Sequence, residues 1–144
     1  MADPRTIVVG IDGSKESRRA LRWACEEARL RGLAVLAVAV WNVFPITLEP
    51  LVGTMPWEHI GEPEKVTQAT LQAIAAEMAD DFPEVRLDQR VLAGHPAEEL
   101  IKLSADAFIL VVGAQGHGGF LEMLVGSTSK HVLSHSACTV MVVR

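Results

Sequence analysis

The chain has 144 residues, which is enough for one compact domain over residues 1–144 with a full hydrophobic core. Its 13 Lys and Arg residues and 18 Asp and Glu residues give a formal net charge of −5, which argues against nucleic acid as a partner. Hydrophobic residues make up 49% of the chain and aromatic residues only 5%. We therefore expect a core of Val, Leu, Ile and Ala, which is typical of a parallel sheet covered by helices.

The cysteines and the apolar segments indicate the compartment. Cys25 and Cys138 lie far apart and in no metal-binding or redox spacing, so we expect two buried, reduced thiols. The longest apolar run, residues 33–41, is shorter than the ~20 residues that span a bilayer. The apolar stretch after residues 1–5 is too short for a signal peptide. We expect a cytoplasmic protein without membrane contact.

The first half of the chain alternates strand and helix signals. Residues 6–11 (TIVVGI) predict a strand, and Asp-Gly-Ser at 12–14 predicts the turn after it. Apolar residues then recur at helical spacing on one face of residues 15–31. After Gly32, residues 34–40 are almost entirely apolar, as in a strand that is covered on both faces. A parallel sheet is the expected result.

The middle of the chain is less regular. Residues 42–63 hold four prolines and form a connection longer than most compact domains contain, which is typical of a lid, a partner surface or disorder. A helix is predicted from Glu64, with one apolar stripe that includes Leu71 and Phe82. Residues 85–91 alternate between apolar and charged side chains, which indicates a strand at the edge of the sheet.

The last part continues the alternation. Pro96 begins a helix that ends near Asp106, and residues 107–112 (AFILVV) predict a central strand. Glycine-rich residues 113–119 follow, then a helix at 127–134 and a last strand at 139–143. This order predicts a doubly wound α/β domain with right-handed crossovers.

Two strand ends suggest a ligand site, because open α/β sheets bind ligands beyond the carboxyl ends of their strands. Gly10 and Asp12 end the first strand, and the glycines from Gly113 end the fourth. Free N–H groups in such a loop favour anions, and so does the helix start at 126–129 with its three hydroxyls. A purely structural reading stays open, since glycines turn chains, Ser127 can cap a helix and Asp12 can form an Asx turn.

Two common nucleotide motifs are absent from the sequence. It contains no GxxxxGK[ST], and its glycine cluster follows the fourth strand instead of the first. The second strand ends in Val-Trp-Asn at 40–42, without the acid that a dinucleotide fold requires. The chain is therefore predicted to be neither a P-loop protein nor a dinucleotide-binding protein.

The spacing of the glycines resembles that of a known family. Gly113-xx-Gly116, nine residues and then Gly126-Ser127 match the G-2x-G-9x-G-[S/T] signature of the universal stress protein family. The opening IVVGIDGS and the closing TVMVVR are also similar to that family, especially to its actinobacterial members, so the resemblance covers the whole chain. It implies an open five-stranded parallel sheet of order 3-2-1-4-5 with helices on both faces, in which the first and fourth strands are neighbours.

The resemblance also implies an adenine nucleotide, ATP or AMP-like, between those two strands, and a role as a stress-response sensor or regulator. Asp12 would lie near ribose and phosphate or hold Mg²⁺ with the phosphates, and the backbone of Val40 would meet adenine. The remaining implied binding residues are Gly10, Gly113, Gln115, Gly116, His117, Gly118, Gly126, Ser127, Thr128 and Ser129.

The sequence departs from the family pattern at two loop positions. Similar proteins often carry Arg where Gln115 and His117 stand, and neither replacement supplies a fixed positive charge at pH 7. We therefore expect weaker or more metal-dependent triphosphate binding, with AMP or a cyclic nucleotide as other guests. A dimeric adaptor with little nucleotide binding is the alternative function.

The sequence also bears on catalysis and on self-association. The sequence shows no nucleophile with a base and an orienting group, so we expect no catalytic residue and at most slow ATP hydrolysis. His131 and His135 have the spacing of a metal pair on one helix face, with surface histidines as the other interpretation. The apolar last strand, Thr139 to Val143, predicts a homodimer through that edge.

Overall fold

The computed structural model describes residues 4–41, 62–114 and 127–144. These residues form one five-stranded sheet of order β3-β2-β1-β4-β5, in which every pairing is parallel. The strands are β1 (Thr6–Gly10), β2 (Ala34–Trp41), β3 (Leu87–Ala93), β4 (Ile109–Gly113) and β5 (Thr139–Val143), and the helices are α1 (Lys15–Arg31), α3 (Pro63–Asp81), α4 (Pro96–Ser104) and α5 (Ser127–His135). The predicted class and strand order are confirmed.

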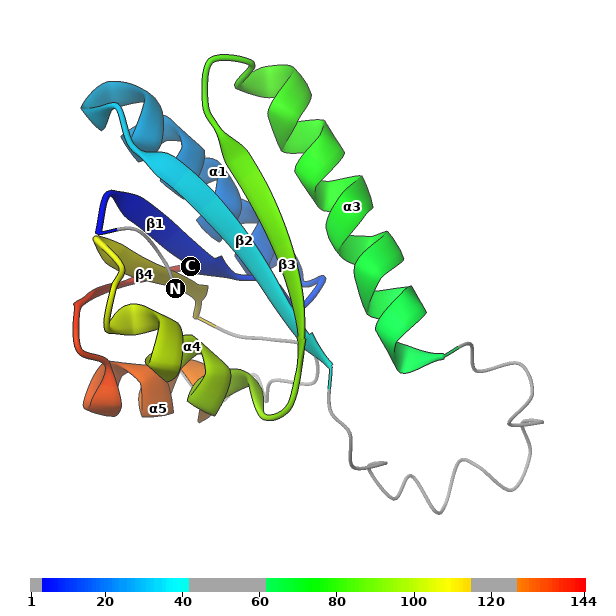
Figure 1. Ribbon diagram of the computed structural model, residues 1–144, viewed down its shortest axis with the longest axis vertical. Coiled ribbons are helices and arrows are strands. Elements are labelled where there is room, and N and C mark those ends of the chain that lie inside the picture. Colours follow the sequence, from blue (N-terminus) through cyan, green and yellow to red (C-terminus); the bar gives the residue numbers. More distant parts are fainter. Residues whose placement is uncertain (1–3, 42–61, 115–126) are drawn as a thin grey trace.

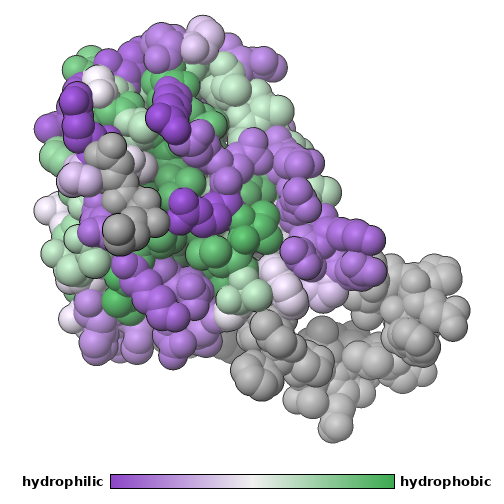
Figure 2. Space-filling view, viewed as in Figure 1, coloured by the Kyte–Doolittle hydropathy of each residue, from purple (hydrophilic) through white to green (hydrophobic). Residues whose placement is uncertain are grey.

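The sheet separates two hydrophobic cores. Because side chains of a strand alternate between its faces, Ile7 and Val9 of β1 pack with α1 and α3, whereas Val8 packs with α4 and α5. Figure 1 shows α4 and α5 in front of the sheet and α1 behind it. Figure 2 shows hydrophobic side chains gathered in the centre of the front face, with hydrophilic ones around them. Both faces of the central strands are therefore covered, as their continuous apolar sequence predicts.

Helix α1 is delimited by two local signals. Ser14 is the N-cap, and its side-chain oxygen accepts a hydrogen bond from the backbone N–H of Ser17 at 3.2 Å. Gly32 ends the helix in the left-handed conformation at φ 67°, which glycine adopts without steric cost. The buried face between these ends carries the small residues Ala20, Ala24 and Ala28. This helix therefore packs closely on the sheet.

Helices α1 and α3 are joined at their surface by charged groups. Arg18 and Arg22 of α1 pair with Glu77 and Asp81 of α3 at 3.2 and 2.6 Å, and each exposed pair contributes less than about 1 kcal/mol. Phe82 caps the end of α3 and is buried, with the Arg22 and Arg29 guanidinium groups 5.7 and 5.4 Å from its ring centroid. Burial of Phe82 contributes more than the ion pairs do.

Several boundaries and burial states differ from expectation. Strand β4 begins at Ile109 instead of Ala107, and Phe108, just before it, is 42% exposed. Cys25 is buried as predicted, but Cys138 is only half-buried, because it lies beside the edge strand β5.

Most of the irregular connection, residues 42–61, lies outside the described residues. No helix among the described residues has the length and apolar character needed to cross a bilayer.

Candidate functional site

The carboxyl ends of β1 and β4 lie next to each other. These strands pair in parallel, with Val8 opposite Leu110 and Val9 opposite Val111. The chain leaves β1 through Asp12 and reaches the end of β4 at Gly113, so both predicted ligand loops start from one edge of the sheet. This edge is also where the strand order reverses, since β1 connects to β2 on one side and lies beside β4 on the other.

Asp12 belongs to a tight turn that starts α1. Its Oδ1 accepts hydrogen bonds from the backbone N–H of Ser14 at 2.9 Å and from the Ser14 hydroxyl. Gly13 has φ 85°, a conformation in which a side chain would be strained. The Asx turn considered as a structural reading is therefore present. The Asp12 residue is nevertheless exposed, so the turn holds a carboxylate at the sheet edge beside β4.

Val40 lies on β2 beyond the point where β1 ends, and its backbone groups point to the side of β2 on which β1 lies. The Val38 carbonyl accepts from the Ile11 N–H on the β1 side, and the Trp41 carbonyl accepts from the Gly94 N–H on the β3 side. Because backbone groups alternate along a strand, the N–H and carbonyl of Val40 point toward β1, whose last paired residue, Gly10, lies opposite Val38. One donor and one acceptor therefore lie together at the edge, a pattern that suits the polar edge of a base.

A buried hydrogen bond joins the start of α5 to the end of β4. Ser129 is only 3% exposed, and its hydroxyl donates to the Gly113 carbonyl at 2.5 Å. The two residues lie sixteen positions apart, so nothing in the local sequence pattern predicts this contact. Ser129, which the resemblance places among the ligand-binding residues, directs its hydroxyl donor to the protein in this structure. This bond holds the first turn of α5 against the end of β4.

Gly113 is also explained by packing. A Cβ atom at this position would lie 2.8 Å from Glu16 Cβ, 2.9 Å from the Glu16 carbonyl carbon and 3.0 Å from the Ser17 nitrogen. Gly10 is less restricted, because its added Cβ would meet the movable end of Leu100 at 2.9 Å. Gly113 thus allows the first turn of α1, which follows Asp12, to approach β4 closely.

The start of α5 faces this edge through its backbone. Ser127 is the first helical residue, and Thr128 after it is half-buried. The N–H groups of these first residues have no acceptor within the helix, and the positive end of the helix dipole lies here. Five other predicted residues, Gln115, Gly116, His117, Gly118 and Gly126, lie outside the described residues. The described part of the site therefore consists of Asp12, the Val40 backbone, Gly113 and the first turn of α5.

The described residues show no metal cluster and no reactive thiol at this edge. Within residues 4–41, 62–114 and 127–144, no group of three or more His, Cys, Asp or Glu side chains has a metal-binding arrangement. Burial raises the pKa of the Cys25 thiol to about 11, so this cysteine stays protonated near neutral pH. Burial also raises the pKa of Cys138. The described groups are suited to binding through backbone and a carboxylate.

A parallel sheet of order 3-2-1-4-5, in which the loop after β1 and the start of α5 lie where the strand order reverses, defines an open, doubly wound α/β protein. A family model described as the universal stress protein family matches residues 4–144. The chain belongs to the universal stress protein family.

Relatives of known sequence or structure agree with this assignment. A universal stress protein of Mycolicibacterium smegmatis is 37% identical over 139 residues, a match that covers 96% of this chain and 45% of the relative. The chain thus spans about half the length of such curated relatives. Solved structures of a universal stress protein in complex with cAMP and of one from Archaeoglobus fulgidus in complex with dAMP both superpose with a TM-score of 0.68. They are 24% and 23% identical, and each match covers 99% of this chain and 98% of the solved one.

Proposed function

We propose that this chain binds an adenine nucleotide, ATP or AMP-like, at the carboxyl edge between β1 and β4, and acts as a sensor or regulator in a stress response. The observation that carries the proposal is the junction at Gly113. There the end of β4, the first turn of α1 and the Ser129 hydroxyl of α5 meet, which brings Asp12 and the α5 N-terminus to one edge. The backbone donor and acceptor of Val40 lie on β2, which is the neighbour of β1 on the side away from β4.

The described groups suit the three parts of a nucleotide. The Val40 N–H and carbonyl can pair with the polar edge of adenine, since both point into the edge that β1 leaves. The helix N-terminus at Ser127 and Thr128 favours phosphate. The Asp12 carboxylate would repel a phosphate chain unless a cation lies between them, which suits a hydroxyl of ribose or a Mg²⁺ ion.

Residues 115–126 determine how much positive charge the proposed site offers to a phosphate chain. Gln115 and His117 offer no fixed positive charge, so the proposal includes weak or Mg²⁺-dependent ATP binding and gives AMP and cyclic nucleotides a place. The cAMP and dAMP that accompany two similar structures are monophosphates, which supports that range of ligands. Gly116, Gly118 and Gly126 are proposed to supply backbone N–H groups, in keeping with the matched spacing.

A second function remains as a candidate because two polar side chains of the described site already have protein partners. The Asp12 carboxylate accepts from the N–H and hydroxyl of Ser14, and the Ser129 hydroxyl donates to the Gly113 carbonyl. In that case the glycine signature maintains the packing of α1 and α5, and the chain is an adaptor that binds little nucleotide. In either case we propose a cytoplasmic homodimer that forms through β5, whose residues 140–143 are half-buried at the edge of the sheet.

The direct test is to identify what the purified protein holds and what it takes up. Denatured protein is analysed for released nucleotide by mass spectrometry, and calorimetric titrations compare ATP, ADP, AMP and cyclic AMP with and without Mg²⁺. Binding of a monophosphate, or of ATP only with Mg²⁺, is the expected result. No released nucleotide and no heat with any ligand would favour the adaptor, and tight binding of ATP without metal would contradict the role given to Asp12.

A substitution at Asp12 separates the carboxylate from the turn. Asp12→Asn keeps an oxygen that accepts from Ser14 but removes the charge, and we expect ATP affinity in Mg²⁺ to fall roughly tenfold. AMP affinity without metal should stay the same or rise, because a repulsive charge is gone. Asp80→Asn is the matched control, since it removes the same charge from the exposed C-terminal end of α3. Equal effects of both substitutions would show that only net charge matters.

A further inference from the structure

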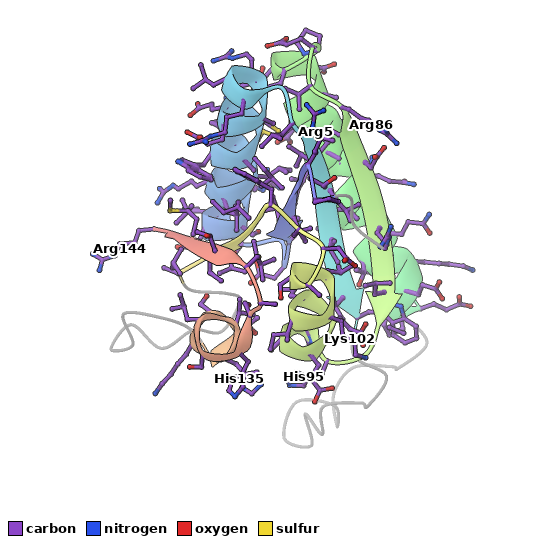
Figure 3. The ribbon with its side chains drawn as sticks, turned by 60° about the vertical axis from the view of Figure 1, so that its left-hand side comes forward. Arg5, Arg86, His95, Lys102, His135 and Arg144 are labelled. Carbon is purple, nitrogen blue, oxygen red and sulfur yellow. The ribbon has the colours of Figure 1, made fainter. Side chains whose placement is uncertain are left out.

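The outer side of α5 carries two histidines that the nucleotide site does not use. His131 and His135 lie one helical turn apart and are both exposed, whereas Val132, on an adjacent side of the helix, is fully buried. Figure 3 shows His135 on the side of α5 that is turned away from the sheet. These side chains therefore contribute nothing to the core and are open to an ion from solvent.

The two imidazoles are already arranged as a pair. Their ring centroids are 4.5 Å apart and their planes differ by 23°. His135 Nδ1 lies 3.1 Å from the His131 carbonyl oxygen, and since a carbonyl only accepts, the proton of the neutral ring is on Nδ1 and the lone pair is on Nε2. Metal-binding histidines usually donate their second nitrogen to a carbonyl or carboxylate in this way, which sets the tautomer and the ring orientation.

We propose that His131 and His135 form a two-imidazole site for a divalent transition-metal ion, with water in the other coordination positions. Metal–imidazole bonds are about 2.0–2.1 Å long, so the two coordinating nitrogens must lie within about 4 Å of each other, which rotation of these exposed, neighbouring side chains allows. No third His, Cys, Asp or Glu joins the pair among the residues that the structure describes. Such an open nitrogen site suits Cu²⁺ or Ni²⁺, which accept tetragonal coordination, better than Zn²⁺, which prefers a closed tetrahedron.

Ni²⁺ is the probe, because it does not oxidise the free thiols of Cys25 and Cys138. Calorimetric titration should give one Ni²⁺ per chain, and either His131→Gln or His135→Gln should lower the affinity at least about tenfold, as even loss of an outer-shell partner costs about 10- to 100-fold. Ni²⁺ should also raise the Tm of the original protein but not that of either variant. His95→Gln is the matched control, since His95 is exposed and precedes a different helix, α4.

The outcome is decided by the single variants. If either His131→Gln or His135→Gln keeps the original Ni²⁺ affinity, or if His95→Gln weakens it equally, the pair is not the site. All three positions are exposed, so circular dichroism should show an unchanged fold in each variant. Because the readout is Ni²⁺ binding without nucleotide, failure of this proposal leaves the proposed nucleotide site unaffected.

Discussion

Gly113→Ala tests whether the first glycine of the signature is required by packing. The added Cβ would lie 2.8 Å from Glu16 Cβ and 2.9 Å from the Glu16 carbonyl carbon, whereas carbon atoms in contact are ordinarily about 3.5–4.0 Å apart. Either the first turn of α1 or the end of β4 must therefore move by about 1 Å. The neighbouring atoms belong to or adjoin the helix backbone, so rotation of a side chain cannot relieve the overlap.

The magnitude follows from the cost of overpacking. Extra methyl groups in well-packed sites cost about 1–3 kcal/mol, and we expect the upper part of that range for Gly113→Ala because backbone must shift. For a chain of this size each kcal/mol lowers the Tm by about 2–4 °C, which gives a fall of roughly 4–12 °C. Gly10→Ala should cost less, because its Cβ meets only the movable end of Leu100.

Urea unfolding followed by circular dichroism measures both variants against the original protein. Gly32→Ala serves as a reference of a different kind, since nothing lies within 4 Å of its Cβ and only the left-handed φ of 67° opposes it, at about 1–2 kcal/mol. A change of less than about 0.5 kcal/mol in the free energy of unfolding of Gly113→Ala would refute a packing requirement for glycine at this position. If it is confirmed, loss of nucleotide by this variant reports on packing as well as on direct contact.

Two further predictions concern buried groups. Ser129→Ala leaves the Gly113 carbonyl without the donor at 2.5 Å and should lower the free energy of unfolding by about 1–3 kcal/mol in the same assay, whereas Ser134→Ala, which removes an exposed hydroxyl from the same helix, should cost little. Equal costs would contradict a special role for the buried bond. Burial raises the pKa of Cys25 from an ordinary 9.0 to about 11, so folding favours the protonated thiol, and its contribution to stability is present below pH 9 and lost as pH rises toward 11. The free energy of unfolding should therefore fall more steeply with pH over this range for the original protein than for Cys25→Ala. Parallel pH profiles of the two proteins would exclude the shift in the Cys25 pKa.

The sequence alone determined the local elements because their signals are local. The turn at residues 12–14 and Gly32 mark the ends of α1, the continuous apolar run of β2 indicates a strand covered on both faces, and alternation at residues 85–91 indicates an edge strand. These patterns arise from backbone sterics and from which faces are buried, so they can be read without the fold. The sheet order and the family followed from the spacing of the glycines, since that spacing resembles a known family.

The tertiary structure decided what the individual site residues do. Ser129 lies sixteen residues from Gly113, and only the crossover from β4 to α5 brings its hydroxyl to that carbonyl. The closeness of Gly113 to Glu16 depends likewise on α1 crossing the end of β4, and the free edge at Val40 depends on where β1 stops. Such contacts join segments far apart in the chain, so their chemistry is set by how the layers pack. The sequence could therefore name the residues of the candidate site but could not separate those that hold the fold from those that face a ligand.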